Sequence, residues 1–517
     1  MYRVEPIIYR REQSGTVEFM SGVDGHTLTH LLYEAGKEKG TPKMSIGVLG
    51  YKHIEDTKRC VESVLRFVGD IDYELILMDN GSNDENETLE YYQSVPTDRK
   101  KIIQVEDPLG PAFGCIFGTR LMYEYARGDI FVFLGNDNII TENALQNMIT
   151  CLDSSPDIGL VTPMSSNAYM LQNPGLQYSN FEEMHAVAKA FNQSDPRKWQ
   201  ERIQTSTVAT AIKREALVRS GFYGFWTAEI DMCHRIRLAG YKLILLGDTW
   251  VCHNHNYEEK EETHKLTSDN SIETMQEARL GGLKLFSDIM IFENQLLSLL
   301  EKPSEKVPKL LAVNVAAGQP LLDVKNRLRE YEIFDSEASA FTTDAKYYTL
   351  LLSVANQVFC DRIQFLKENL GDQTFNVAVL GTPINLFPDP EDVLRDLLNA
   401  LEPGGQLLFK LKNACDSGMF QSIFGNPVSA GTEKKLVLAV GDVKRMAGKY
   451  GAARMKVKKS VGPYTPEWIE TVTNVMVNAK VTPNVQETIE NILTDEFLFH
   501  VTKASGDLEG ASARQIS

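Results

Sequence analysis

The segment MSIGVLGY (residues 44–51), followed by HIEDTKRCVESVLRFV (53–68) and YELILMD (73–79), decides the fold class. The first and third pieces are short apolar runs that suit buried strands, and the middle piece repeats apolar residues at helical spacing. The alternation continues through strand-like runs at KIIQV (101–105), DIFVFLG (129–135) and IGLVTP (158–163). Alternation of this kind predicts an α/β fold, a mostly parallel sheet with helices on both faces.

A second strand–helix series follows the charged segment EKPSEKVP (301–308), which has the composition of a linker. Its expected elements are the strands KLLAVNV (309–315), YEIFD (331–335), FNVAVLG (375–381) and QLLFKLK (406–412), and a helix over 349–370. A long amphipathic helix is expected over 275–300. We therefore predict an N-terminal extension (1–43), a first α/β domain (44–255), a helical extension with a linker (256–308), a second α/β domain (309–503) and a tail (504–517).

Size, charge and cysteine usage limit the class of protein. A chain of 517 residues is too long for one core, so several domains are expected. The formal net charge of -17 argues against a nucleic-acid partner, because phosphate binding needs clustered Lys and Arg. Seven dispersed cysteines without a C-x-x-C pair indicate reduced thiols and a cytoplasmic location, with peripheral attachment to the inner membrane face as an alternative. No run approaches about 18 apolar residues, so no transmembrane segment is expected.

Acidic residues stand where the strands of the first series end. Asp79 lies in LILMDNGSND, Asp137 lies in FVFLGNDN, and Glu229 and Asp231 open the helical segment AEIDMCHRIRLAGY. Ligands of open α/β sheets bind beyond the carboxyl ends of the strands. A nucleoside diphosphate needs a hard divalent cation with oxygen ligands, and an acceptor hydroxyl needs a carboxylate to take its proton. The set offers one acid for the nucleotide, one for the metal and one for the proton.

Residues 44–255 resemble glycosyltransferase family 2, whose catalytic domain has the GT-A fold. The matching pieces occur in the family's order: VLGYKHIEDTKRCVESVL, LILMDNGSND, DPLGPAFGCIFGTR, GNDN, AEIDMCHRIRLAGY and VCHNH. The resemblance implies an inverting transferase that moves a sugar from a nucleoside diphosphate donor, with a UDP-sugar expected. The acceptor would be a hydroxyl of a glycan or a protein, such as flagellin or another bacterial surface molecule. The irregular segment 164–207 is expected to frame that acceptor.

The resemblance also assigns roles to individual positions. Nucleotide-sugar binding falls to Leu49, Gly50, Tyr51, Asp79, Gly110, Asn136 and Asp137, catalysis to Glu229 with Asp231 beside it, and Mn²⁺ or Mg²⁺ binding to Asp137 and His253. Two positions depart from the family's pattern. Gly135 replaces the first acid of the D-x-D motif, and Ala228 replaces the first acid of the E-D pair. The first departure removes one carboxylate ligand of the expected metal site, and the second leaves Glu229 alone at the base position.

Simpler interpretations of the same residues remain open. Asp79 before Asn80-Gly81 is also typical of turn chemistry, since Asp and Asn bond their own backbone there. Asp231 and Arg235 are spaced as an i, i+4 pair that stabilises a helix. Cys252, His253 and His255 resemble a zinc cluster, although they lack a fourth ligand.

Residues 309–503 resemble a class I methyltransferase domain, through LEPGGQLLFKLK, FNVAVLGTPINLFPDPEDVLRDLLNAL and EFLFHVTKA. In the cofactor loop LAVNVAAG, Asn314 and Ala316 replace the family's first two glycines and only Gly318 remains, while Asp335 could be the ribose-binding acid. Side chains at those positions crowd a cofactor, so S-adenosylmethionine is not expected to bind. The domain is expected to serve acceptor binding or a homodimer. The rivals are a bifunctional glycosyl- and methyltransferase and a non-catalytic scaffold that binds a sugar-nucleotide.

Overall fold

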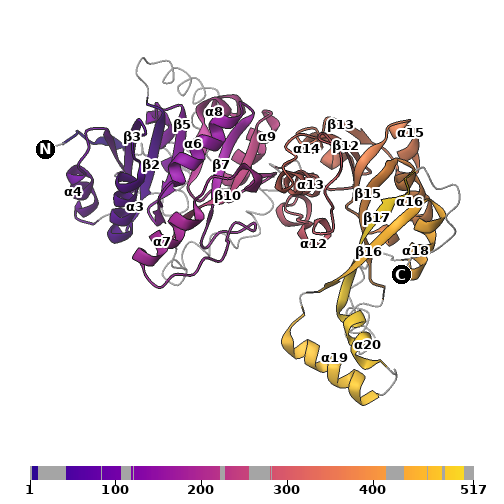
Figure 1. Ribbon diagram of the computed structural model, residues 1–517. Helices are drawn as coiled ribbons and strands as arrows, with labels where there is room; N and C mark the ends of the chain where they lie inside the picture. Colours follow the sequence, from indigo (N-terminus) through magenta and orange to yellow (C-terminus); the bar gives the residue numbers. More distant parts are fainter. Residues whose placement is uncertain are drawn as a thin grey trace. The chain divides into compact units, whose positions relative to one another are not determined.

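The computed structural model describes residues 3–9, 42–82, 84–105, 118–119, 121–221, 228–254, 280, 282–414, 436–462, 464–479 and 484–505. The chain divides into two compact units, Met1–Met290 and Ile291–Ser517, and each is described by itself (Figure 1). The division falls within 256–308, the segment that the sequence assigns to an extension and linker, and the other domain boundaries stay predictions. No helix among the described residues is long and apolar enough to cross a membrane.

Unit 1 is built on one large sheet with the strand order β1-β4-β3-β2-β5-β9-β7-β10-β6, and β8 also pairs with β10. The strands are β1 (Ile7–Tyr9), β2 (Met44–Gly50), β3 (Tyr73–Asp79), β4 (Lys100–Val105), β5 (Ile130–Gly135), β6 (Asn138–Ile139), β7 (Ile158–Ser165), β8 (Trp199–Arg202), β9 (Thr210–Lys213) and β10 (Lys242–His253). Strands β4, β3, β2 and β5 run parallel, and so do β7 and β10. Strand β9 joins the two groups and runs antiparallel to both.

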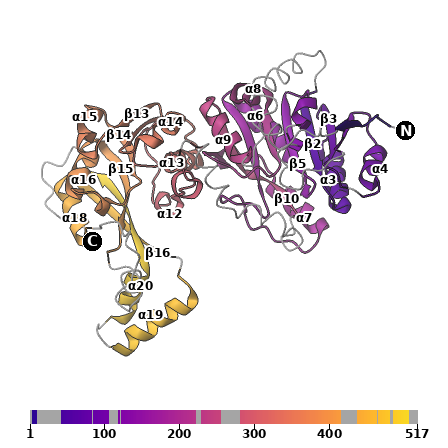
Figure 2. The same ribbon diagram turned by 180° about the vertical axis from the view of Figure 1, so that it is seen from behind.

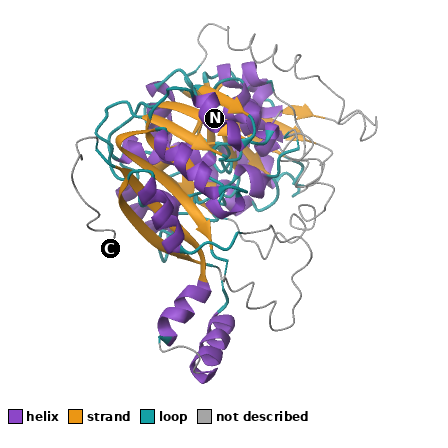
Figure 3. Ribbon diagram, turned by 90° about the vertical axis from the view of Figure 1, so that its right-hand side faces the viewer, coloured by secondary structure: helices purple, strands orange, loops and turns teal. Residues whose placement is uncertain are grey.

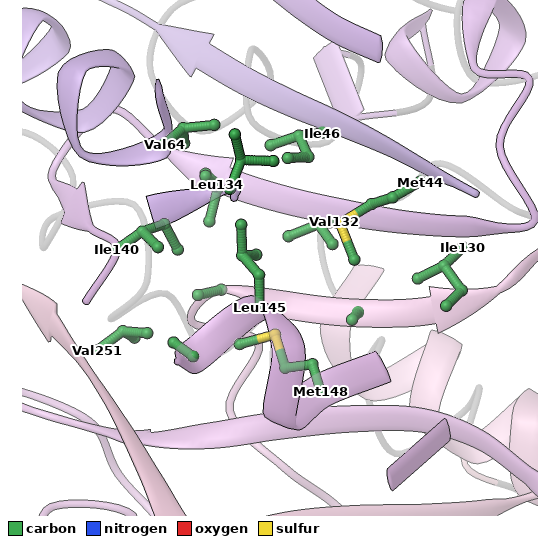
Figure 4. Close-up of a cluster of buried hydrophobic side chains, with 14 of the residues drawn as sticks. Met44, Ile46, Val64, Ile130, Val132, Leu134, Ile140, Leu145, Met148 and Val251 are labelled. Atoms are coloured by element: carbon green, nitrogen blue, oxygen red, sulfur yellow. The ribbon is translucent and has the colours of Figure 1, made fainter. Parts of the chain in front are cut away.

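Helices cover both faces of this sheet. They are α3 (Ile54–Phe67), α4 (Glu87–Ser94), α6 (Ala144–Ser154), α7 (Phe181–Phe191), α8 (Arg214–Ser220) and α9 (Ala228–Leu238). Successive side chains of a strand face opposite ways, so Ile46 and Val48 pack with α3 and α6 on one face, whereas Leu49 packs with α8 and α9 on the other. Figure 4 shows the first of these cores, and Figure 2 shows α8 and α9 from behind. The predicted fold class is confirmed.

Unit 2 holds a second sheet with the order β13-β12-β11-β14-β15-β17-β16. Its strands are β11 (Lys309–Val313), β12 (Glu337–Thr342), β13 (Gln357–Cys360), β14 (Phe375–Leu380), β15 (Leu401–Lys412), β16 (Ala452–Val461) and β17 (Thr494–Lys503). β13, β12, β11, β14 and β15 are parallel, and β17 runs antiparallel to both of its neighbours. The order reverses direction between β11 and β14, which is the switch point of a doubly wound, Rossmann-like sheet.

The helices of unit 2 flank this sheet and extend beyond it. The longer ones are α13 (Gln319–Glu330), α16 (Pro390–Asn399), α18 (Val440–Lys449), α19 (Pro466–Ala479) and α20 (Val485–Leu493), and short ones are α12 (Asn294–Leu297), α14 (Tyr348–Leu351) and α15 (Leu366–Leu370). Between β16 and β17 the chain forms α19 and α20, which share a small apolar cluster of their own. Figure 3 shows these two helices beyond the end of the sheet.

Two helix predictions from the sequence are wrong for the described residues. The predicted helix over 349–370 is interrupted by β13, which pairs with β12 along its open side. Asn356 fixes this pairing, because its carboxamide oxygen accepts a hydrogen bond from Ala338 N at 2.8 Å. The predicted helix over 275–300 contains only a π-turn at Leu285–Ile289 and the four-residue α12 in its described part, after Gly282 at a φ of 85°. Strand pairing and glycine conformation outweigh the helical pattern in these segments.

Candidate functional site

The carboxyl ends of β3, β2 and β5 meet at one edge of the first sheet. Asp79 ends β3 and lies opposite Gly50 at the end of β2, while Leu49 lies opposite Gly135 at the end of β5. The chain leaves β2 toward β3 on one side and later returns to β5 on the other, so this edge is the switch point of the sheet. The predicted nucleotide-binding residues Leu49, Gly50 and Asp79 therefore lie together where an α/β sheet binds ligands.

Hydrogen bonds from two sides hold the turn after β2, which carries the predicted nucleotide-binding residue Tyr51. Asn80 N donates to Gly50 O at 2.9 Å and Lys52 N donates to Ser82 Oγ at 3.0 Å. From the β5 side, the predicted residue Asn136 donates through its side-chain amide to Lys52 O at 3.1 Å. Lys52 and the following residue have φ values of 53° and 48°, a conformation that costs non-glycine residues about 1–3 kcal/mol each. The surrounding bonds hold this strained turn between the two acidic loops.

Asp79 is buried and partly satisfied by its own loop. It is 4% exposed, and its Oδ1 accepts hydrogen bonds from Ser82 N at 3.0 Å and from Ser82 Oγ at 2.6 Å. Burial raises the pKa of Asp79, and the hydrogen bonds from Ser82 oppose that rise. The turn interpretation is therefore correct for Oδ1 of Asp79.

Asn80 is a candidate that the sequence reasoning missed. Its side chain is 1% exposed, and neither Nδ2 nor Oδ1 has a hydrogen-bond partner in the described structure. Buried polar groups are nearly always paired, so an orphaned carboxamide at a ligand-binding edge points to a bound group. The sequence places Asn80 inside the D-N-G-S motif, but its residue type equally suits a turn, and only the unsatisfied geometry separates the two.

Asp137 and His253 come together from strands far apart in the sequence. Asp137 lies between β5 and β6, and β6 pairs with β10 so that Asn138 is opposite His253. Asp137 Oδ2 lies 3.5 Å from His253 Nε2, and both side chains are mostly buried. Asn254 N donates to Asp137 O at 2.8 Å and Asn138 Nδ2 donates to Asp137 Oδ1 at 3.2 Å. The structure thus brings together the two residues predicted to hold a metal.

This pair fits a divalent cation that shares its coordination sphere with a substrate. Two ligands at about 2.1 Å from one ion and at right angles lie about 3.0 Å apart, so a small side-chain shift brings the pair into range. Among the described residues, no group of three or more His, Cys, Asp or Glu could hold a metal. A Cβ added at Gly135 would lie 2.9 Å from Asp137 Oδ1, so the glycine leaves space beside the carboxylate. If a cation binds here, phosphate oxygens and water would have to complete its sphere.

The zinc alternative fails for Cys252. Neighbouring residues of a strand face opposite ways, so Cys252 and His253 cannot share one ion from β10. Cys252 is buried beside Tyr178, whose hydroxyl lies 3.5 Å from its Sγ, and burial raises the pKa of the thiol. His255 lies outside the described residues.

The beginning of α9 carries the predicted catalytic residues. Helix α9 packs on β10 and runs back along it, so its first residues lie at the same edge as His253. The backbone of Glu229 lies in the first turn of α9, and the structure describes nothing of its side chain. Asp231 Oδ2 accepts a hydrogen bond from Arg235 Nε at 2.9 Å, with the Asp231 side chain 5% exposed. This is the helix-stabilising pair of the simpler interpretation, and a catalytic role for Asp231 stays a prediction. Gly110 lies outside the described residues.

At the carboxyl ends of the parallel strands of unit 2, the side chain of Asn314 links two loops. Asn314 and Ala316 adopt φ values of 50° and 48°, so the loop after β11 keeps a glycine-like backbone with non-glycine residues. Asn314 Oδ1 accepts a hydrogen bond from Thr343 N at 2.9 Å and so links the loops that follow β11 and β12. This link lies at the edge where a methyltransferase-like loop would present bare backbone to S-adenosylmethionine, and the expectation that this cofactor does not bind stays a prediction.

The prediction that Asp335 is the ribose-binding acid of unit 2 is wrong. Asp335 precedes β12 and lies at the amino ends of the parallel strands. The predicted strand YEIFD is absent there, and the strand is EASAFT at Glu337–Thr342. The acid that follows this strand at the carboxyl edge is Asp344, whose Oδ1 accepts a hydrogen bond from Lys346 N. The three consecutive small residues of EASAFT give this strand a weak sequence signal.

Known proteins resemble this chain over limited segments. The family model described as glycosyl transferase family 2 matches residues 45–219. A solved GalNAc-T7 structure with UDP, GalNAc and Mn²⁺ is 14% identical, with a TM-score of 0.32, and covers 42% of this chain. The chain spans 44% of that protein's length.

Two further solved structures share similar low identity. A mannosyltransferase from Pyrobaculum calidifontis in complex with GDP-Man and Mn²⁺ is 15% identical, with a TM-score of 0.32, over 48% of this chain and 69% of its own. A SAM-dependent methyltransferase from Archaeoglobus fulgidus is 12% identical, with a TM-score of 0.27, over 38% of this chain and 86% of its own. No curated protein matches the chain. The match of the family model to the segment that contains Asp79 and Asp137 shows that this chain carries a glycosyltransferase domain of family 2 at residues 45–219.

Proposed function

We propose that unit 1 transfers a sugar from a nucleoside diphosphate donor, with a UDP-sugar as the first candidate, to a hydroxyl group with inversion at the anomeric carbon. One observation carries the proposal. The Asp137 carboxylate and the His253 imidazole stand 3.5 Å apart at the strand-end edge that also holds Asp79 and the orphaned amide of Asn80. A nucleotide-sugar has a base at one end and a diphosphate at the other. The base would lie at the end with the Asn80 amide, and the diphosphate at the end with Asp137 and His253.

The donor would lie across the turn that follows β2. Asp79 and Asn80 would bond the nucleoside, because both are buried polar groups beside Gly50 and Tyr51. Asp137 and His253 would hold Mn²⁺ or Mg²⁺, which supplies positive charge next to the departing diphosphate. Gly135 has no side chain that could serve as a second ligand, so the metal site would depend on the single carboxylate of Asp137.

Glu229 would take the proton from the acceptor. In the proposed step, the acceptor oxygen forms a bond to the anomeric carbon, the bond from that carbon to the diphosphate oxygen breaks, and the hydroxyl proton passes to Glu229. Attack in line with the leaving group inverts the anomeric configuration. The ion pair of Asp231 with Arg235 would hold the first turn of α9 and leave Glu229 as the base.

Metal-dependent turnover tests this proposal. Purified chain is incubated with a panel of UDP- and GDP-sugars and Mn²⁺, and nucleoside diphosphate release is measured without and with saccharide acceptors. Glu229→Gln and Asp137→Asn should each reduce transfer by about 100-fold or more, as is typical when a catalytic group is removed. Glu215→Gln, an exposed change on α8, serves as a matched control and should retain activity. Undiminished turnover in both site variants would sink the mechanism.

A non-catalytic scaffold is the second candidate, because the missing acid at Gly135 weakens the metal site. The same assay separates the two, since a scaffold would bind nucleotide without releasing a diphosphate product. The acceptor is proposed as a glycan or protein hydroxyl, including flagellin-like surface molecules. A cytoplasmic location and a homodimer through unit 2 are also proposals, which fractionation and light scattering test.

A further inference from the structure

The chain makes a strained turn directly after β7, at the same edge as His253. Asn167, Met170 and Leu171 have φ values of 51°, 61° and 58°. Non-glycine residues rarely adopt this left-handed conformation, and it persists only where the surroundings impose it. The surrounding structure therefore imposes a defined conformation on the side chains that this turn exposes.

Hydrogen bonds fix both ends of this turn. Ser166 Oγ and Asn167 Nδ2 donate to His253 O at 3.2 Å and 3.0 Å, so the first end is tied to the backbone of the predicted metal ligand. At the other end Gln172 is 1% exposed, and it exchanges two side-chain hydrogen bonds with the Ser206 backbone. The turn is thus tied to β10 at one end and to the segment before β9 at the other.

Two apolar side chains of this turn are exposed to solvent. Tyr169 is 65% exposed and Leu171 is 53% exposed, although both lie on a turn that costs conformational energy. Tyr169 is two residues from Asn167, which limits their Cα separation to about 7 Å. The backbone of Tyr169 therefore lies near the residue that is bonded to His253 O, and its side chain belongs to no core cluster of the described residues.

The surrounding sequence has an unusual composition. Residues 158–181 contain no Asp, Glu, Lys, Arg or His, although Asp, Glu, Lys and Arg make up 24% of the chain. The exposed positions instead carry amides, including Asn167, Asn173 and Gln177. Rigid aromatic rings with adaptable amide and hydroxyl groups are suited to neutral polar ligands. An uncharged strip disfavours a charged polymer or an acidic or basic peptide.

We propose that the turn at 166–173 is an acceptor subsite in which the Tyr169 ring stacks against a pyranose ring of an uncharged glycan. One face of a pyranose carries C–H groups that meet the negative face of an aromatic ring, while its hydroxyls meet amides. Leu171 extends the apolar platform, and the tie from Asn167 to His253 sets its distance from the donor. This inference rests on the proposed function, because it names the acceptor of the same reaction.

A binding measurement tests the subsite without turnover. The full chain with UDP and Mn²⁺ is mixed with neutral methyl glycosides and their disaccharides, and binding is followed by saturation-transfer NMR. Tyr169→Ala should lower the affinity for the bound saccharide by about tenfold or more, the loss expected from removing one aromatic stacking partner. Tyr169→Phe should keep it, because the ring remains. Leu238→Ala, which truncates another exposed apolar side chain, at the C-terminal end of α9, is the control.

The outcomes separate this inference from the proposed function. Equal saccharide binding by Tyr169→Ala and the unaltered chain overturns the subsite, and so does an unaltered chain that binds no saccharide of the panel. A parallel fall in UDP affinity in Tyr169→Ala also overturns it, because the residue would then act on the donor. Saccharide binding that depends on Tyr169, in a chain that releases no nucleoside diphosphate from UDP- or GDP-sugars with or without acceptor, would keep the subsite and refute the proposed transfer.

Discussion

Replacing Asn80 by leucine should stabilise the free protein and weaken nucleotide binding at the same time. Leucine branches at the same carbon as asparagine, so it retains most of the shape of the side chain and removes its polarity. Asn80 is 1% exposed and neither of its side-chain polar atoms has a partner among the described residues. A buried polar group without a partner costs about 1–3 kcal/mol, which leucine avoids.

The expected magnitudes follow from these values. Allowing for imperfect packing of leucine, unit 1 should gain about 1–2 kcal/mol, which corresponds to a rise in Tm of about 2–8 °C for a unit of this size. UDP at about 100 times its Kd stabilises the unaltered protein by about 2.7 kcal/mol. Loss of two hydrogen bonds of about 1 kcal/mol each raises Kd about 30-fold, and the same UDP concentration then stabilises by only about 0.9 kcal/mol.

Scanning calorimetry with and without UDP and Mn²⁺ measures both effects. Asn192→Leu is the matched control, because Asn192 is equally buried but fully bonded, with Nδ2 donating to Trp250 O and Oδ1 accepting from Trp250 N. Asn192→Leu should therefore destabilise the protein. The reasoning is refuted if Asn80→Leu destabilises like the control, or if its UDP-dependent shift in Tm equals that of the unaltered chain.

Three further predictions concern the metal pair and unit 2. Asp137→Asn and His253→Ala should each weaken Mn²⁺ binding, measured by EPR titration in the presence of UDP, and the double variant should lose less than the sum because the two residues act on one ion. Burial lowers the pKa of His500 to about 4 from 6.5, so protonation favours the unfolded state, and unit 2 should lose stability as the pH falls from about 6.5 to about 4. Guanidinium unfolding of His500→Phe should show a flatter pH dependence over that range, and an unchanged slope would contradict the assignment. S-adenosylmethionine should give no binding heat in calorimetry with the unaltered chain, because Asn314 bridges the loops that follow β11 and β12, and micromolar binding would overturn this view.

The sequence predicted the parts of the site that strand direction determines. Asp79 and Asp137 each follow an apolar run, and parallel strands bring their carboxyl ends to one edge, so their meeting needed no knowledge of side-chain packing. Asn80 was not predictable in the same way, because its importance lies in hydrogen bonds that are missing. Asp335 was misplaced because the strand that follows it, EASAFT, has too few large apolar residues to stand out. The roles of the site residues stay predictions.

A bulge in β10 decides which side chain of this strand faces Asp137. Leu246 pairs with Pro163 and Trp250 pairs with Met164, so three residues, Gly247 to Thr249, have no counterpart on β7. The side chain of Asp248 holds the bulge, with Oδ2 accepting from Trp199 Nε1 at 2.8 Å and from Asp195 N at 2.6 Å.

An odd number of inserted residues reverses the facing of every side chain that follows in a strand. If the register of Leu246 with Pro163 continued instead, Asp248 rather than Val251 would pair with Ser165, and His253 would lie three residues further along the strand with the opposite facing. The strand that supplies the histidine also lies beyond residues 45–219, the segment that the family model matches. The approach of His253 to Asp137 therefore depends on the register that this bulge sets, and the buried Asp248 that holds the bulge is not among the predicted site residues.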